Sequence, residues 1–433
     1  MEALSAKIQH LYRQVQSLLV YRDLLQHEPS QAGLNLLQIL SKRDATGEIL
    51  AQEAEILNAY GEWFYAIAHT GNNWQGWIEQ TLAIADNPFT QQAQQQDEVE
   101  LSQGILKAAQ HDLAVLQSWA LEGPILVRQA IAAIVTDAVP SVEDLSRKPP
   151  QTNLNGSEWG NWRDALPMLM AHYRQGGVGS LAQYRGLRWR DGHLEGIEHP
   201  DAIQLADLVG YNAQKTALQH NTETLLAGYA ALNVLLYGSR GSGKSALIKA
   251  LLTAYGDRGL RLIELNKADM IHLPQVVEHL RPSPLKFIIF IDDLSFEEDE
   301  DHYKALKVVL EGNLTARPQN VAVYATSNRR HLIREFFGDR PRPSQADEVQ
   351  AWDTVQEKLS LSDRFGLTLT FEPANQDTYL DIVRHLARQV QVNLPDAELT
   401  HQALQWAVRQ NVRSGRTARQ FIDYVKGMQI LKG

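Results

Sequence analysis

The chain has 433 residues, 44% hydrophobic and 21% charged, with a formal net charge of −10. This is the composition of a globular protein with two or three domains, and the lack of cysteine excludes disulfide bonds and thiolate metal sites. Of the net charge, −9 belongs to residues 1–175, with 11 Lys and Arg against 20 Asp and Glu, which argues against DNA as the partner of that region. The sequence shows no run of eighteen apolar residues and no signal-peptide pattern, so we expect a cytoplasmic protein.

The N-terminal region, residues 1–137, is predicted to be an all-helical domain. Apolar side chains recur every three or four residues over 4–26, and similar patterns lie around 46–69, 99–119 and 124–136. Six of the nine tryptophans are at positions 63, 74, 77, 119, 159 and 162. We expect them to anchor a helical core, and an exposed aromatic face for a partner is the alternative.

Residues 138–175 lose the helical pattern and are rich in proline and asparagine, so we predict a linker between domains. Residues 184–190, Tyr-Arg-Gly-Leu-Arg-Trp-Arg, predict a short strand, with a small basic patch for nucleic acid as the alternative. Beyond it, helical patterns alternate with apolar runs at 233–237, 261–265, 286–292, 320–328 and 367–371. Such runs are typical of strands buried on both faces, so we predict a parallel sheet with helices on both faces.

A strand, a glycine-rich loop and a helix are predicted in succession around residue 240. The loop reads Gly238-Ser-Arg-Gly-Ser-Gly-Lys-Ser245 and matches the phosphate-loop pattern G-x-x-x-x-G-K-[ST] without mismatch. In such a loop, backbone N–H groups surround phosphate oxygens, the lysine contacts the β- and γ-phosphates, and the last hydroxyl holds Mg²⁺. The residues predicted to bind nucleotide are Gly238, Ser239, Arg240, Gly241, Ser242, Gly243, Lys244, Ser245 and Ala246.

Two aspartates follow the apolar strand that ends at Ile291. An apolar strand ending in a carboxylate is the usual source of the magnesium ligand in phosphate-loop proteins, so Asp292 joins Ser245 as a predicted metal ligand. Asp293, next to it, is the candidate base for the attacking water. A turn that merely ends the strand is the alternative for both aspartates.

A second nucleotide motif is rejected on its position. Residues 266–269 read Asn-Lys-Ala-Asp, the N-K-x-D pattern with which GTPases read guanine. In GTPases this motif follows the magnesium strand, whereas here it precedes Asp292, and no D-x-x-G follows. We therefore expect ATP as the nucleotide.

From about residue 180 to its end, the chain resembles the AAA+ superfamily of ATPases, and its motifs resemble those of a bacterial ATP-binding AAA+-like family of unknown function. The matching segments are Leu208-Val-Gly-Tyr211, Leu235 to Ser245, Ile291-Asp-Asp-Leu-Ser-Phe296, Leu306-Lys-Val-Val-Leu-Glu-Gly312, Tyr324-Ala-Thr-Ser-Asn-Arg-Arg-His-Leu332 and Ser414-Gly-Arg-Thr-Ala-Arg-Gln-Phe421. The resemblance implies an ATPase core at 176–373 and a helical lid at 374–433.

The resemblance also implies roles for single residues. Asn328 follows the strand expected between the other two motif strands, and would hydrogen-bond the γ-phosphate or the attacking water. Arg364 would reach the ATP of a neighbouring subunit in a homo-oligomer, with Arg329 and Arg330 as further candidates.

The lid would add an arginine that contacts phosphate, Arg419 or, as the second candidate, Arg416. AAA+ enzymes usually carry glutamate where Asp293 stands, and the shorter side chain leaves the rate of hydrolysis open. The resemblance implies an ATPase that uses ATP and Mg²⁺ to remodel or load a protein partner, bound through the acidic N-terminal domain. The alternative is a slow ATP-dependent switch or adaptor that acts with DNA, as replication initiators and loaders do.

Overall fold

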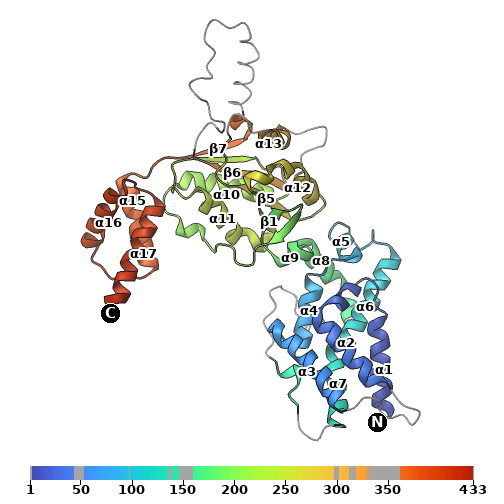
Figure 1. The fold of residues 1–433 in the computed structure, drawn as a ribbon. Coiled ribbons are helices and arrows are strands. Elements are labelled where there is room, and N and C mark those ends of the chain that lie inside the picture. Colours follow the sequence, from blue (N-terminus) through green and yellow to red (C-terminus); the bar gives the residue numbers. More distant parts are fainter. Residues whose placement is uncertain are drawn as a thin grey trace. The chain divides into compact units, whose positions relative to one another are not determined.

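The computed structural model describes residues 2–42, 53–96, 98–134, 139–145, 159–296, 302–311, 318–328, 332 and 361–432. The chain divides into two compact units, Met1–Gln183 and Tyr184–Gly433 (Figure 1). In the ranges given above, none of the helices combines the length and the apolar character that crossing a membrane requires.

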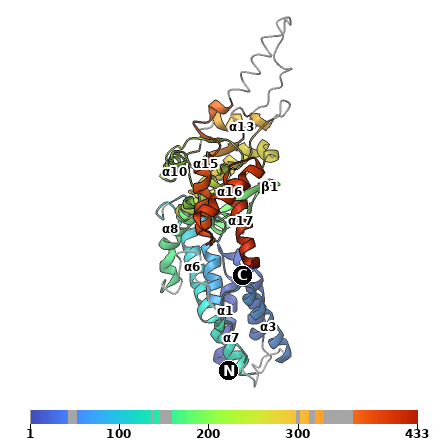
Figure 2. The ribbon, with the colours of Figure 1, turned by 90° about the vertical axis from the view of Figure 1, so that its left-hand side faces the viewer.

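The first unit consists of helices and short 3-10 turns in its described part. Its helices are α1 (Glu2–Gln16), α2 (Glu28–Ser41), α3 (Glu53–Thr70), α4 (Trp74–Ala83), α5 (Pro88–Ala93), α6 (Gln103–Leu121), α7 (Gly123–Ala132), α8 (Leu166–Gly176) and α9 (Gly179–Gln183). Helices α1, α2 and α3 pack in succession, and α6 and α7 pack against α1 (Figures 1 and 2). The prediction of an all-helical N-terminal region is confirmed.

Tryptophans form the centre of this unit. Trp63, Trp74 and Trp119 are at most 2% exposed, and the Trp74 ring meets the other two edge to face, at centroid distances of 5.2 and 4.9 Å. The Trp74 indole N–H donates to the backbone carbonyl of Trp119 at 3.0 Å, which satisfies its one polar group. The other three tryptophans of the unit are also buried. They are core anchors, and the alternative of an exposed aromatic face is wrong.

The boundary between the units lies later than the sequence indicates. Part of the expected linker belongs to the first unit, because Trp159, Leu169 and Tyr173 are buried in its core. The Tyr173 hydroxyl donates to the carbonyl of Leu82 at 2.8 Å. The prolines and asparagines that suggest a linker come before α8, and the apolar anchors that follow them complete the core.

The first helix ends earlier than its apolar pattern indicates, at Gln16 and not near residue 26. The chain turns there because the carboxylate of Asp112 on α6 accepts the backbone N–H groups of Leu19, Val20 and Tyr21 at 2.8 to 3.0 Å. Asp112 is 0% exposed, and burial raises its pKa, although the three N–H donors oppose the rise. A residue distant in sequence therefore sets this turn, and a local pattern does not reveal it.

The second unit is built on a seven-stranded sheet. Its strands are β1 (Gly186–Arg190), β2 (His193–Gly196), β3 (Val234–Gly238), β4 (Leu260–Glu264), β5 (Lys286–Ile291), β6 (Val321–Ser327) and β7 (Leu367–Phe371). They lie in the order β2-β1-β4-β5-β6-β3-β7, and all neighbours are parallel except the antiparallel pair β1 and β2. The predicted parallel sheet is confirmed, with an antiparallel hairpin added at one edge.

The sheet is covered on both faces. Ile288 and Phe290 of β5 belong to the apolar cluster formed with α10 (Asn212–Leu226) and α11 (Lys244–Tyr255). Ile289 and Ile291 alternate with them, face the other side of the sheet, and are 0% exposed. The flanking helices of this part also include α12 (Leu273–Leu280) and α13 (His302–Glu311).

Three helices follow the last strand: α15 (Gln376–Gln389), α16 (Asp396–Gln410) and α17 (Gly415–Lys432). They enclose a hydrophobic core of their own, in which Tyr379, Val383, Ala403 and Ile422 are 0% exposed. The predicted helical C-terminal region is confirmed.

The basic segment at 184–190 forms strand β1, as predicted. Its arginines are opposed by carboxylates in the pairs Arg185–Asp257, Arg188–Glu264 and Arg190–Glu195. The aromatic residue between them, Trp189, is 2% exposed. The segment therefore lacks the unopposed charge and the exposed ring of a nucleic-acid patch.

Replacing Asp112 by alanine is expected to lower the free energy of unfolding by about 1–3 kcal/mol, because three backbone N–H groups lose their acceptor. Urea unfolding followed by tryptophan fluorescence measures this change, since six of the nine tryptophans lie in the first unit. Asp164→Ala is the control, because Asp164 is exposed and its loss should change the free energy by less than about 0.5 kcal/mol. Equal effects of the two substitutions would show that Asp112 does not hold the turn.

Candidate functional site

The strand order brings the predicted motifs to one edge of the sheet. Strand β6 lies between β3 and β5, as expected, so the carboxyl ends of the three parallel strands lie together. The phosphate loop follows β3, the two aspartates follow β5, and Asn328 follows β6. Ligands of open parallel sheets bind at this edge.

The turn from β3 into the loop requires glycine at position 238. Gly238 has a φ of +140°, and a Cβ there would lie 2.0 Å from the carbonyl oxygen of Phe371. The same oxygen accepts the backbone N–H of Ser239 at 3.0 Å. The end of β7 therefore holds the start of the phosphate loop in place.

Lys244 is the first residue of α11 and is 6% exposed. Its ammonium donates to the carbonyls of Gly238 and Ser239, at 2.9 and 2.8 Å, and to Asn328 Oδ1 at 3.3 Å. Burial lowers the pKa of Lys244, while the two nearby aspartates act in the opposite direction. These three partners are neutral, so the ammonium can exchange them for anionic phosphate oxygens at a gain in Coulomb energy.

A hydroxyl and a carboxylate meet beside the loop. Ser245 Oγ donates to Asp292 Oδ1 at 2.6 Å, and the Thr326 hydroxyl donates to the same oxygen at 2.5 Å. Mg²⁺ takes oxygen ligands, few of them from protein, so a hydroxyl and a carboxylate at this separation fit its chemistry. Thr326 is not among the residues predicted for the site. It lies two positions before Asn328, so in an extended chain the two side chains point to the same side.

Asp293 has an uncommon backbone conformation, with a φ of +51°. Its N–H donates to Thr326 Oγ1 at 2.9 Å, and its Oδ1 accepts from Asn328 Nδ2 at 2.6 Å. Aspartate enters this left-handed region more readily than longer side chains, because its short carboxylate can bond locally. The conformation is a physical reason for aspartate where the AAA+ resemblance leads us to expect glutamate.

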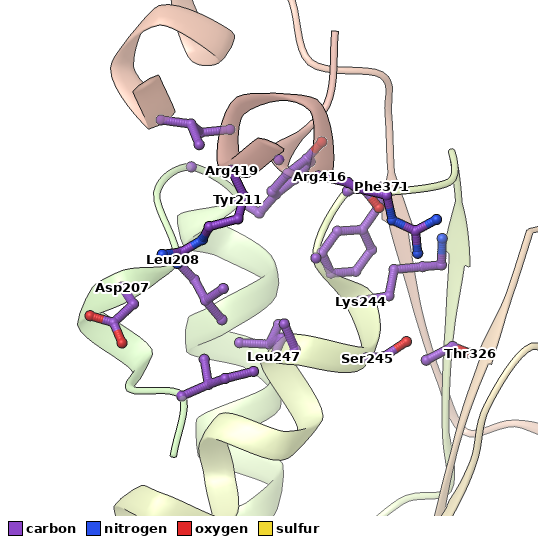
Figure 3. A pocket seen from close by; sticks show the side chains of 18 of the residues that line it. Asp207, Leu208, Tyr211, Lys244, Ser245, Leu247, Thr326, Phe371, Arg416 and Arg419 are labelled. Atoms are coloured by element: carbon purple, nitrogen blue, oxygen red, sulfur yellow. The ribbon is translucent and has the colours of Figure 1, made fainter. Parts of the chain in front are cut away.

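These groups line a cavity of about 730 Å³ whose lining has both polar and apolar residues. Figure 3 shows Lys244, Ser245 and Thr326 at one side, with Leu208 and Tyr211 at the other. The apolar lining comprises Ile203, Leu208, Val209, Tyr211, Leu247, Phe371, Ile382 and Leu386. The rings of Tyr211 and Phe371 lie 4.9 Å apart between centroids, which gives the cavity an aromatic wall.

The C-terminal helices touch the phosphate loop directly. A Cβ added to Gly241 would lie 2.8 Å from Ser414 Oγ and 3.3 Å from Arg416 Cβ, so the start of α17 lies against the loop. Arg416 and Arg419 both line the cavity. In Figure 3 the guanidinium of Arg416 points toward Lys244, whereas the side chain of Arg419 extends toward Leu208.

The other predicted residues lie away from the cavity or outside the described part. Gly238 and Ser239 do not line it, and contribute the carbonyls that hold Lys244. Arg364 ends a 3-10 turn before β7, is half-buried, and does not line the cavity either. Arg329 and Arg330 lie outside the described residues.

The N-K-x-D segment, residues 266–269, is not among the lining residues of the cavity. It begins the 3-10 turn Lys267–His272 after β4. This position agrees with its rejection as a guanine-reading loop.

Residues 182–429, more than half of the chain, match the model of the family described as "Protein of unknown function (DUF815)". Among solved structures, the chain is similar to the Thermotoga maritima RuvB Holliday junction branch migration motor, at 14% identity and a TM-score of 0.32, over 51% of this chain and 72% of that chain. A mutant of the same RuvB gives 16% identity and a TM-score of 0.37, over 53% of this chain and 68% of that chain. Scores this low carry no argument about function. No curated protein matches the chain.

The matched residues include the phosphate-loop sequence and the carboxylate at the end of β5. The chain belongs to the DUF815 family, and the match covers nearly all of its second unit.

Proposed function

We propose that this protein binds and hydrolyses ATP with Mg²⁺, and uses the reaction to remodel or load a protein partner. The observation that carries the proposal is the 2.6 Å hydrogen bond between Ser245 Oγ and Asp292 Oδ1. It joins the hydroxyl of the phosphate loop to the carboxylate that ends β5, the pair that phosphate-loop enzymes use around magnesium.

The two sides of the cavity suit the two ends of ATP. At the polar side, the N-terminus of α11 adds partial positive charge to the ammonium of Lys244 and the guanidinium of Arg416. The rings of Tyr211 and Phe371 would pack against the flat base. A volume of about 730 Å³ is within the range of small-molecule and cofactor sites.

Ser245 and Asp292 would hold Mg²⁺, which when bound neutralises charge on the β- and γ-phosphates. Asp293 would accept the proton of the attacking water, and the Asn328 amide would orient that water without competing for its proton. Asn328 bonds both Asp293, at 2.6 Å, and Lys244, at 3.3 Å, so it joins the base to the phosphate-binding ammonium.

One observation favours the slower alternative. The Asp293 carboxylate is short, and one of its oxygens is already engaged by Asn328 at 2.6 Å, so activation of water would be weak. Slow hydrolysis suits an ATP-dependent switch or adaptor that acts with DNA, in which turnover only resets a bound state. The acidic first unit is a poor surface for DNA, and we therefore favour the protein-directed ATPase.

We also infer a homo-oligomer in which Arg364 reaches the ATP of a neighbouring subunit. A guanidinium suits this role because it binds two phosphate oxygens and offsets charge as the bond breaks. The position of Arg364 outside its own cavity is compatible with such a contact.

We further propose that the first unit binds the protein partner. The cytoplasmic location stays a prediction.

Replacing Lys244 by alanine should weaken ATP binding at least about 100-fold, because the phosphates lose a desolvated cation. Isothermal titration calorimetry measures the affinity. Lys249→Ala is the matched control, since Lys249 lies on the same helix and pairs with Asp201 at 2.7 Å. ATP affinity unchanged in Lys244→Ala would contradict the proposed site.

Asp293→Asn should keep ATP affinity within about threefold and lower phosphate release at least about 100-fold, because the base is removed and the phosphate contacts stay. Steady-state phosphate release at saturating ATP measures the rate, and chelation of Mg²⁺ by EDTA should stop release in the unsubstituted protein. Release by Asp293→Asn at the full rate would mean that another group is the base.

The same assay on the unsubstituted protein, with and without DNA, separates the two proposed functions. A rate of phosphate release that is near background without DNA and rises when DNA is added favours the switch.

Arg416→Ala should lower the affinity for ATP about tenfold and leave that for AMP nearly unchanged, because its guanidinium points toward the phosphate side. Arg419→Ala removes an equal charge three residues along α17, and we expect it to change ATP affinity less. Calorimetric titration with both nucleotides gives the comparison. The opposite ranking would assign the phosphate contact to Arg419.

A further inference from the structure

A second cavity, of about 520 Å³, lies within the first unit. It is enclosed by α4 and the turn after it, the 3-10 turn Arg22–Gln26, and α9. Helix α8 packs against both α4 and α9 in this part of the unit (Figure 1). None of its lining residues lines the nucleotide cavity, so it is a separate site.

Part of the lining is apolar and aromatic. Tyr21, Leu24 and Trp77 are 2, 4 and 8% exposed, and are fixed in the core of the unit. The ring of His27 meets Trp77 edge to face, at a centroid distance of 6.1 Å. Such a surface suits a flexible aliphatic stem or a delocalised cation.

Two exposed carboxylates complete the lining. Neither Asp23 nor Asp86 forms an ion pair among the residues that the structure describes. Asp86 Oδ1 accepts from Gln91 Nε2 at 2.9 Å, which orients the group. A Cβ at Gly179 would lie 2.8 Å from Asp86 Oδ2, so glycine there leaves room for this carboxylate.

The charge around the cavity has one sign. No lysine or arginine is among its lining residues. Residues 1–183 carry 11 Lys and Arg against 20 Asp and Glu, so the whole unit attracts cations. Nucleic acid carries the same sign of charge and is disfavoured as a ligand.

The apolar, aromatic lining and the two carboxylates together favour one class of ligand. An arginine side chain has an aliphatic stem for the aromatic surface, and a guanidinium whose fork of donors matches carboxylates. A bare metal ion fits less well, because the described residues contain no group of three or more acidic or histidine side chains able to hold one.

We propose that this cavity is the docking site for an arginine side chain of a protein partner. The proposal deepens the partner binding inferred above for the first unit, and it rests on no nucleotide contact. Asp23 and Asp86 receive the guanidinium, and the stem contacts the small part of Trp77 that the cavity leaves exposed.

The experiment uses the full chain and a blocked pentapeptide, Gly-Ala-Arg-Ala-Gly, with the citrulline peptide as its neutral counterpart of nearly equal shape. Saturation-transfer NMR titration measures both affinities. The double variant Asp23→Asn/Asp86→Asn tests the carboxylates. Glu98→Gln/Glu100→Gln is the matched control, because it removes two exposed charges of the same unit outside the cavity.

We expect the arginine peptide to bind at least about tenfold more tightly than the citrulline peptide. The aspartate variant should lose this preference, and the control should change affinity less than about twofold. Equal binding of the two peptides to the unsubstituted protein, or equal effects of the two double variants, would overturn the proposal. ATP affinity measured on the same proteins separates this result from the proposed ATPase, because a failure here leaves the nucleotide site untouched.

Discussion

The hydrogen bond between Ser245 and Asp292 joins two segments 47 positions apart in the chain. The bond depends on the strand order, which places the ends of β3 and β5 near each other with only β6 between them. The two ends are therefore two strand spacings, about 10 Å, apart. Side chains of the middle strand fill that gap. Thr326 of β6 bonds Asp292, and Asn328, the residue after β6, bonds Lys244 and Asp293, so the end of this strand joins the groups contributed by its two neighbours.

The parts of this site that lie within one motif could be predicted from sequence. A phosphate loop and a strand-end aspartate are recognisable because local spacing and local apolar pattern define them. Thr326 could not be found in this way, because a threonine in a buried strand looks the same whether it packs or bonds a carboxylate across the sheet. Its role depends on a hydroxyl that reaches the Asp292 carboxylate on the neighbouring segment, and no local pattern shows that contact.

The two lid arginines show another limit of the sequence. Arg416 and Arg419 are three residues apart, so both lie on similar faces of α17, and helical periodicity does not separate them. The contact between Gly241 and the start of α17 distinguishes their positions, because it places the turn that carries Arg416 against the loop. In the first unit, the turn after α1 escaped prediction for a similar reason. Its N–H groups are satisfied by Asp112, about 90 residues further along the chain.

Strand β7 has a mechanical consequence for the nucleotide site. Its last residue, Phe371, holds the backbone of Ser239, and α15 begins at Gln376, so only four residues separate the loop's support from the C-terminal helices. One of them is Pro373, whose fixed φ stiffens so short a connection. So short a connection leaves little freedom between the three helices and the loop, and we therefore expect a change in the position of one to affect the other.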